Sequence, residues 1–241
     1  MAPRKWRAVA DLRRSAMPWL VRAGHRFSVP KDRSGMHRVE LNGAMLGTGP
    51  LDPVIWTAPR HRAEAEQALS GATRPVALCV GANWAGKTWP AERFAALADE
   101  IRAMDGYGPG TDFVLVGGAD EREAGAALLA EGAGASGGGR VIDAFGLDVL
   151  STYELLKMCR LMVANDSAMM HLAAATGIPT IGLFGPTNDR HYRPWGKNGH
   201  VVRTPENADA LMERVRRAPE EVSSLMDGIT VAQVTEMIRR L

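Results

Sequence analysis

The chain has 241 residues, of which 46% are hydrophobic and 23% are charged, and its formal net charge at pH 7 is +2. This length is enough to bury a substantial core as one large or two modest domains. The composition is that of a soluble globular protein, and it excludes a bilayer-spanning helix because no apolar run is long enough.

The first 70 residues contain a predicted helix at about 9–24, followed by a loop-rich tract, "LNGAMLGTGPLDP". No complete strand–helix–strand series is visible there, so we interpret this region as part of a domain. Most of the excess positive charge lies before about residue 40, as Arg and Lys dispersed among Trp, Leu and Phe. Such a surface could meet an anionic membrane, a phosphorylated substrate or nucleic acid, and a solvated helix face explains it equally well. Since no nucleic-acid motif accompanies the charge, we expect no nucleic-acid partner.

From about residue 75, short apolar runs alternate with segments of helical periodicity. Continuous apolar strands joined by helices indicate a parallel sheet covered by helices on both faces. The predicted strands are 75–80, 112–118, 140–146, 160–166 and 179–185, and the predicted helices are 90–104, 121–132, 151–160 and 167–177. The last segment, "VAQVTEMIRRL", is predicted to be a terminal amphipathic helix.

Local signals mark several helix ends. Ser151 with Glu154 three residues later is a capping-box pattern. Pro90 suits a first helical position, and Gly177 with Pro179 just beyond it suits a helix terminus.

The expected compartment is the cytoplasm, because the basic first residues lack the uninterrupted apolar segment of a secretory signal. Cys79 lies in a predicted strand and Cys159 lies late in a predicted helix. In that compartment both are expected to be buried free thiols rather than a disulfide.

Ligands of open α/β sheets bind beyond the carboxyl ends of the strands, where loops enter helices. Polar residues gather at three such ends, and a fourth loop, Gly185-Pro186-Thr187, follows the next strand. The three groups are Asn83 to Thr88, Asp120 with Glu121, and Asp166 to His171. The carboxyl ends of parallel strands lie at the same edge of a sheet, so these three polar groups are expected to lie close together. Together they predict a site, which none of them would indicate alone.

The group at 166–171 has two interpretations. Ser167 and His171 are four residues apart, so they lie on one helical face and would form an anion pocket with the backbone N–H groups at the helix start. Alternatively, Asp166 or Ser167 caps the helix and His171 is simply half-buried. A hydrolase triad is not expected, because no G-x-S-x-G elbow stands between a predicted strand and a predicted helix, and no third group evidently orients the histidine.

The segment "GANWAGKT" at 81–88 matches the phosphate-loop pattern between a strand and a helix, which would indicate a nucleoside triphosphatase. Trp84 is bulky where backbone amides must wrap around phosphate, and Pro90 stands where the helix of such a loop is already under way. In a looser use of the same segment, Lys87 and Thr88 could hold a diphosphate without forming that loop.

Two further groups of side chains carry potential ligand atoms. Asp120 or Glu121 could accept hydrogen bonds from ribose hydroxyls, although an acidic pair favoured by the helix dipole explains them as well. His191 and His200 do not have metal-ligand spacing, so we expect no bound metal and no other cofactor.

Three stretches resemble the carboxyl-terminal half of glycosyltransferase family 9, the lipopolysaccharide heptosyltransferases, which use ADP-heptose. They are "GANWAGKTWPAERFAALADEI", "FVLVGGADERE" and the segment containing "ANDSAMMHLAAATGIPTIGLFGPT". The resemblance covers roughly residues 75–197, and residues 8–70 look like the later part of the family's amino-terminal domain. It is specific because K-x-W-P, D-S-x-x-x-H-L-A-A-x-x-G-x-P and F-G-P-T occur in order.

The resemblance implies an α/β fold of the GT-B type, in which the acceptor binds the first Rossmann-like domain and the donor binds the second. The implied divisions are a partial acceptor-side α/β domain at 1–70, a nucleotide-sugar-binding domain with a Rossmann-type parallel sheet at 71–220, and a carboxyl-terminal helix at 221–241. It also implies inverting, metal-independent transfer of a sugar, heptose by analogy, from a nucleotide-diphosphate donor to a lipopolysaccharide core or lipid-linked acceptor. The basic residues 1–40 would then contact the inner membrane peripherally.

Carried over by position, the resemblance assigns eight donor-site residues. Lys87 and Thr88 would contact the donor phosphate, and Asp120 or Glu121 the ribose. The diphosphate-sugar pocket would be lined by Asp166, Ser167, Ala168 and His171.

The chain departs from the family pattern at two places. Ala168 stands where the family often has glycine. The family's initial strand and glycine-rich loop, with an Asp thought to act as general base, have no counterpart before "VADLRRS". We therefore expect an amino-terminally truncated chain, from a late start or natural shortening, whose catalytic residue is unknown. A nucleotide-sugar-binding remnant without turnover and a phosphate-loop nucleotidase are the alternatives.

Overall fold

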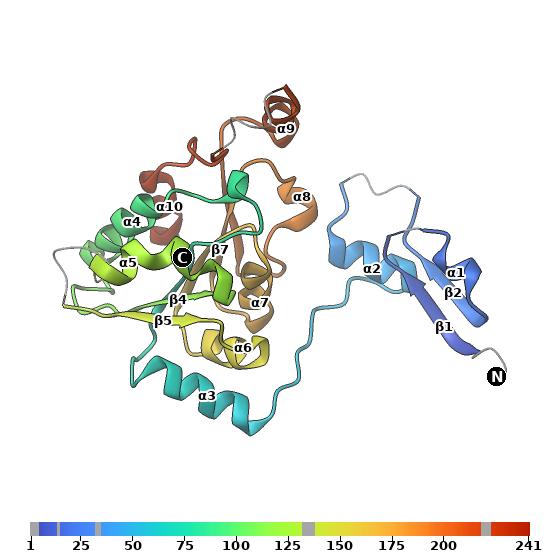
Figure 1. The fold of residues 1–241 in the computed structure, drawn as a ribbon, viewed down its shortest axis with the longest axis horizontal. Helices are drawn as coiled ribbons and strands as arrows, with labels where there is room; N and C mark the ends of the chain where they lie inside the picture. Colours follow the sequence, from blue (N-terminus) through green and yellow to red (C-terminus); the bar gives the residue numbers. More distant parts are fainter. Residues whose placement is uncertain (1–4, 14, 32–34, 132–137, 218–222) are drawn as a thin grey trace. The chain divides into compact units, whose positions relative to one another are not determined.

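The computed structural model describes residues 5–13, 15–31, 35–131, 138–217 and 223–241 (Figure 1). The chain forms two compact units, which are described separately. Unit 1 comprises Met1–Pro53 with Arg190–Tyr192, and unit 2 comprises Val54–Asp189 with Arg193–Leu241. The domain divisions at residues 70 and 220 stay predictions.

Unit 1 contains a strand–helix–strand motif where the sequence predicts one helix. Strand β1 (Trp6–Asp11) pairs in parallel with β2 (Ala23–Ser28), and the short helix α1 (Met17–Leu20) lies between them in the chain. The prediction of a helix at 9–24 is therefore wrong. Pro18 interrupts such a helix, since proline lacks an N–H donor, and it stands instead in the first turn of α1. Helix α2 (Arg38–Leu46) follows and ends at Gly47 in the left-handed conformation, with φ 72°.

Unit 2 is built on a six-stranded parallel sheet in the order β5-β4-β3-β6-β7-β8. The five predicted strands are confirmed to within one residue at each end, and β8, which follows a loop, was not predicted. The strands are β3 (Val76–Cys79), β4 (Phe113–Gly117), β5 (Val141–Phe145), β6 (Leu161–Asn165), β7 (Thr180–Phe184) and β8 (Gly199–Arg203).

Helices cover both faces of this sheet, as predicted (Figure 1). Alternate residues of each strand enter different cores: in β3, Val76 and Leu78 pack on one face and Ala77 and Cys79 on the other. The first face is covered by α4 (Ala91–Ala103), α5 (Ala126–Glu131) and α10 (Val231–Arg239), and the second by α3 (Pro59–Leu69), α6 (Val149–Lys157) and α7 (Ala168–Thr176). The remaining elements are the 3-10 helices η1 (Ala85–Lys87) and η2 (Ala119–Gly125), and helices α8 (Asp189–Tyr192) and α9 (Ala208–Arg217).

The helix-end predictions have mixed outcomes. Gly177 ends α7 in the left-handed conformation, with φ 84°, as predicted. Pro90 precedes α4 as its N-cap rather than occupying its first helical position. The predicted capping box at Ser151 is wrong, because α6 begins at Val149 and Asp148 is its N-cap residue. Asp148 Oδ1 accepts a 2.9 Å hydrogen bond from the Leu150 N–H.

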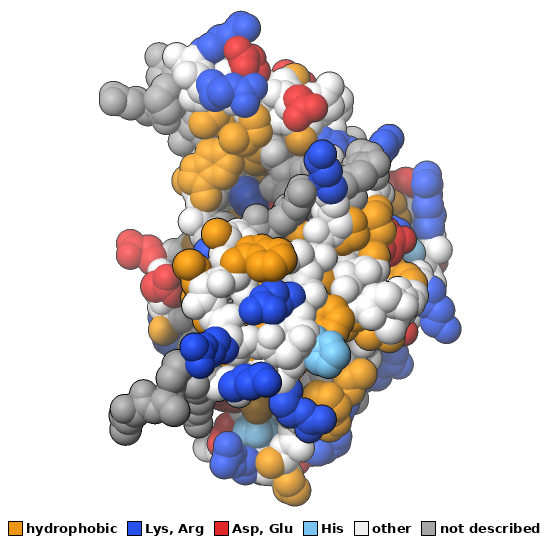
Figure 2. Space-filling view, turned by 90° about the vertical axis from the view of Figure 1, so that its right-hand side faces the viewer, with side chains coloured by type: hydrophobic (Ala, Val, Ile, Leu, Met, Phe, Trp, Pro, Cys, Tyr) orange, Lys and Arg blue, Asp and Glu red, His pale blue; other side chains and the backbone are white. Residues whose placement is uncertain are grey.

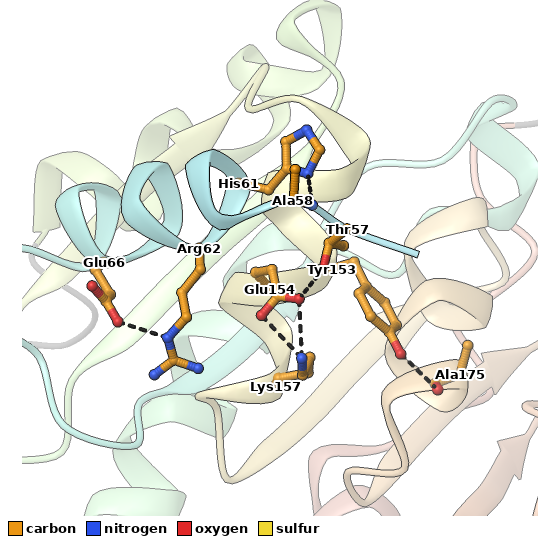
Figure 3. A network of polar contacts seen from close by, with 9 residues as sticks. All are labelled: Thr57, Ala58, His61, Arg62, Glu66, Tyr153, Glu154, Lys157 and Ala175. Atoms are coloured by element: carbon orange, nitrogen blue, oxygen red, sulfur yellow. Dashed lines mark hydrogen bonds and ion pairs between the residues drawn. The ribbon is translucent and has the colours of Figure 1, made fainter. Parts of the chain in front are cut away.

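Ser151 and Glu154 instead join α6 to the segment around α3. The Ser151 hydroxyl donates to Glu64. The Thr57 hydroxyl donates to Glu154, and Lys157 Nζ lies 3.0 Å from both Glu154 oxygens (Figure 3). The Thr57 hydrogen bond, together with Lys157, holds the pKa of the buried Glu154 carboxyl below its usual range. This network fixes α3 against the second face of the sheet.

Both cysteines are free and buried, as predicted. Burial raises the pKa of each thiol to about 12, so neither is a thiolate nucleophile at neutral pH. Among the described residues, the helices are all too short or too polar to cross a bilayer.

Candidate functional site

The strand order places a pocket at the centre of the sheet's carboxyl edge. When the six strands of unit 2 are numbered from one to six along the chain, their order across the sheet is 3-2-1-4-5-6, in which β3 is strand 1 and β6 is strand 4. The connections therefore leave the neighbouring strands β3 and β6 in opposite directions. Such a switch point opens a crevice between the loops, and ligands bind there. A cavity of about 410 Å³ lies at this point. Six of the eight donor-site residues assigned from the family resemblance line it: Lys87, Glu121, Asp166, Ser167, Ala168 and His171.

An ion pair joins the loops that follow β3 and β6. Lys87 Nζ lies 2.7 Å from Asp166 Oδ2, with side-chain exposures of 23% and 9%. A lysine ammonium carries three donors, and within the described residues only Asp166 accepts from Lys87. Lys87 therefore retains donors that can reach an anion in the pocket.

Asn165 fixes the loop that carries Lys87, and it is not among the site residues predicted from the sequence. The fully buried Asn165 side chain accepts from the Trp89 N–H at 3.1 Å and donates to the Val80 carbonyl at 2.8 Å. Trp89 is itself fully buried. The available signal was a polar residue at the last position of an otherwise apolar strand, since a buried amide must find partners.

The amino end of α7 opens into the pocket. Ser167 is the N-cap residue, but its side chain makes no capping hydrogen bond, and its Oγ lies 3.4 Å from Cys79 Sγ. The carboxylate of Asp166 contacts Lys87. The interpretation in which one of these side chains caps the helix is therefore wrong. Ala168 lines the pocket at the first helical position, and the exposed His171 lines it one turn later.

Of the two acidic residues that follow β4, Glu121 lines the pocket and Asp120 does not. Glu121 lines the pocket, and its Oε2 accepts a 2.8 Å hydrogen bond from the Gly118 N–H. A Cβ atom added to Gly81 would lie 2.6 Å from Glu121 Cδ, so glycine is needed for this close approach. Asp120 is exposed and lies outside the lining. Thr88 also lies outside it, and its carbonyl accepts from the Ser224 hydroxyl at 2.8 Å.

The phosphate-loop alternative does not fit this geometry. Lys87 ends the 3-10 turn η1, Thr88 is extended, and α4 begins only at Ala91. A phosphate loop instead enters its helix at the lysine, so that helix amides surround the phosphate. The Trp84 ring also folds over Gly86, where an added Cβ would lie 2.6 Å from it.

The family model for glycosyltransferase family 9 (heptosyltransferase) matches residues 46–221. The chain belongs to glycosyltransferase family 9. The family predicted from the sequence motifs is thus confirmed.

Curated family 9 relatives match at modest identity. The lipooligosaccharide heptosyltransferase 2 of Haemophilus influenzae is 28% identical over 201 residues, covering 79% of this chain and 56% of the relative. The lipopolysaccharide heptosyltransferase 2 of Salmonella typhimurium is 30% identical over 136 residues, covering 56% of this chain and 38% of the relative. The chain therefore spans about half the length, or less, of these relatives.

Solved structures of family 9 share the fold. The family 9 glycosyl transferase from Veillonella parvula superimposes with a TM-score of 0.76 at 21% identity, covering 98% of this chain and 74% of that one. Escherichia coli ADP-heptose lipopolysaccharide heptosyltransferase II gives a TM-score of 0.70 at 20% identity, and the match covers 97% of this chain and 76% of that one. The predicted α/β fold of the GT-B type, with its Rossmann-type parallel sheet, is confirmed.

Among the described residues, His, Cys, Asp and Glu side chains form no group of three that could hold a metal ion.

Proposed function

We propose that the pocket binds the diphosphate of a nucleotide-sugar donor and that the chain serves in glycosyl transfer, with ADP-heptose as the donor type and a lipopolysaccharide core or lipid-linked acceptor. The observation that carries this proposal is the convergence of Lys87, Glu121 and the open amino end of α7 on one cavity. The heptosyltransferase relatives support the sugar, and a structure of E. coli heptosyltransferase WaaC with ADP supports the nucleotide.

The proposed chemistry is a single inverting displacement. An acceptor hydroxyl oxygen bonds to the donor's anomeric carbon, the bond from that carbon to the phosphate oxygen breaks, and the hydroxyl proton passes to a base. Negative charge grows on the departing diphosphate. Lys87 and the positive end of α7 stabilise that charge, which is the role a divalent cation has in metal-dependent transferases. We assign no base among the described residues.

Within this proposal, each lining residue has a part. Asp166 orients the Lys87 ammonium, and Ser167 and Ala168 bring the first α7 amides to the phosphates. His171 lies one turn further along and contacts the phosphate or sugar. Glu121 accepts a hydrogen bond from a ribose hydroxyl, using carboxylate lone pairs that are not taken up by the hydrogen bond from the Gly118 N–H. Thr88 and Asp120 are left out, because they lie outside the cavity lining.

We further propose that unit 1 holds the protein at the cytoplasmic face of the inner membrane. In the described part of residues 1–40, Trp19 is 77% and Leu20 79% exposed, beside exposed arginines such as Arg22 and Arg26. Basic and hydrophobic side chains lie next to one another on the face drawn in Figure 2. Aromatic rings with guanidinium groups suit an anionic lipid surface. Residues 1–4, 14 and 32–34 of this segment lie outside the described residues.

The test is a titration of ADP, ADP-heptose and ATP–Mg²⁺ against the unchanged chain and Lys87→Ala, each with and without a chelator. We expect chelator-insensitive ADP binding that Lys87→Ala weakens. Strict Mg²⁺ dependence with ATP hydrolysis would contradict the proposal. Heptose transfer to a lipid A–core acceptor then separates an enzyme from a binding remnant without turnover.

A further inference from the structure

Residues 224–229, here named the strap, cross the loop that carries Lys87. The Ser224 hydroxyl donates to the Thr88 carbonyl at 2.8 Å, and the Leu225 N–H donates to the Gly86 carbonyl at 3.1 Å. These two carbonyls belong to the residues on either side of Lys87. The strap therefore fixes the backbone from which the lysine side chain extends.

Two further hydrogen bonds extend the same contact toward α4. Trp89 Nε1 donates to the Ile229 carbonyl at 2.9 Å, and Arg93 Nη1 donates to the Asp227 carbonyl at 2.7 Å. The tryptophan of the K-x-W-P motif thus serves to hold the loop, because its ring is buried away from the pocket.

The strap is itself anchored in the core. Met226 and Ile229 are fully buried, and α10, which follows, packs on the same face of the sheet as α4. Gly185 of the F-G-P-T motif leaves room for the strap, since an added Cβ would lie 2.7 Å from Met226 Sδ and 2.8 Å from the Leu225 carbonyl. This accounts for the glycine of a loop that lies outside the pocket lining.

We infer that the strap is a positioning element for donor binding, and that Ser224 acts on the donor phosphate through Lys87 by holding residues 86–88 in place. The inference rests on the proposed function. Lysine has a flexible four-carbon stem and Asp166 contacts only its tip, so movement of the loop backbone would shift the ammonium relative to the phosphate. Electrostatic stabilisation depends on donors held in place before the ligand arrives.

The experiment is a double-mutant cycle on ADP affinity with Ser224→Ala and Lys87→Ala. Ser224→Ala removes the hydrogen bond to the Thr88 carbonyl and also the one that Ser224 Oγ accepts from the Met226 N–H at 3.1 Å, and it should weaken ADP binding about threefold to tenfold. If Ser224 acts through Lys87, Ser224→Ala should have almost no effect in the Lys87→Ala background. Ser224→Thr, which keeps the hydroxyl, should restore most of the affinity. Ser223→Ala is the matched control, because the exposed neighbouring serine makes no hydrogen bond to a described residue.

Hydrogen exchange without ligand gives the second measurement. The amides of Lys87 and Thr88 should exchange faster in Ser224→Ala than in Ser223→Ala. Equal exchange rates, or an effect on ADP affinity that persists undiminished in the Lys87→Ala background, would overturn the inference. Failure of the unchanged chain to bind ADP would instead overturn the proposed function, and the role of the strap in donor binding with it.

Discussion

Replacing Lys87 by methionine tests the ion pair and the proposed site together. The change keeps most of the side-chain volume but leaves the Asp166 carboxylate, only 9% exposed, without its 2.7 Å partner. Removing one partner of a fully buried pair costs about 3–5 kcal/mol of unfolding free energy. Because Lys87 is 23% exposed, we expect about 1–3 kcal/mol here.

The effect on ADP has a different origin and therefore a different rescue. A charge-assisted hydrogen bond contributes about 1.5–3 kcal/mol, so ADP should bind about 10- to 100-fold more weakly to Lys87→Met. The double variant Lys87→Met/Asp166→Asn removes both charges and should recover thermal stability without recovering the ADP affinity. Differential scanning fluorimetry and calorimetric titration in EDTA measure the two quantities. Unchanged ADP affinity in Lys87→Met would refute the reasoning.

Three further predictions concern the pocket, the strap and the α3–α6 network. Glu121→Ala should weaken ADP about tenfold while leaving pyrophosphate nearly unaffected, and Asp120→Ala should change neither, as calorimetry can measure. Gly185→Ala should lower the unfolding free energy by about 1–3 kcal/mol, because the new methyl group would clash with the Leu225 carbonyl of the strap. Denaturant titrations measure this change, and an unfolding free energy equal to that of the unchanged chain would contradict the assigned contact. The pKa of Glu154 is depressed in the folded state, so its stabilisation is present above its ordinary pKa of about 4.3 and is lost as pH falls through the folded value. The stability difference between the unchanged chain and Glu154→Gln should therefore shrink below about pH 4, and a pH-independent difference would contradict this.

The parallel sheet could be predicted because each strand from β3 to β7 is a short apolar run between helical segments, which is typical of strands buried on both faces. The interpretation failed where a local pattern competed with tertiary contacts. Residues 9–24 have helical composition, but Pro18 breaks the helix, and the two ends of this segment belong to the paired strands β1 and β2. The Ser151 and Glu154 spacing matches a capping box, yet both side chains are occupied by Glu64 and Thr57.

The pocket could be located because loops at one sheet edge converge whatever their separation in sequence. Spacing could not decide between Asp120 and Glu121, since neighbours on one 3-10 turn point in different directions and only Glu121 reaches the Gly118 N–H. The strap was not predictable from any local pattern. Its contacts join Ser224 and Thr88 across 136 positions of the chain, and its acceptors are backbone carbonyls that carry no sequence signature.

The most direct measurement is a crystal structure of this chain grown with ADP and without divalent cations. The account predicts the diphosphate at the end of β3 and β6, with phosphate oxygens within hydrogen-bond distance of Lys87 Nζ and of the first backbone amides of α7. A diphosphate bound elsewhere, or one that leaves Lys87 without a phosphate contact, would contradict it.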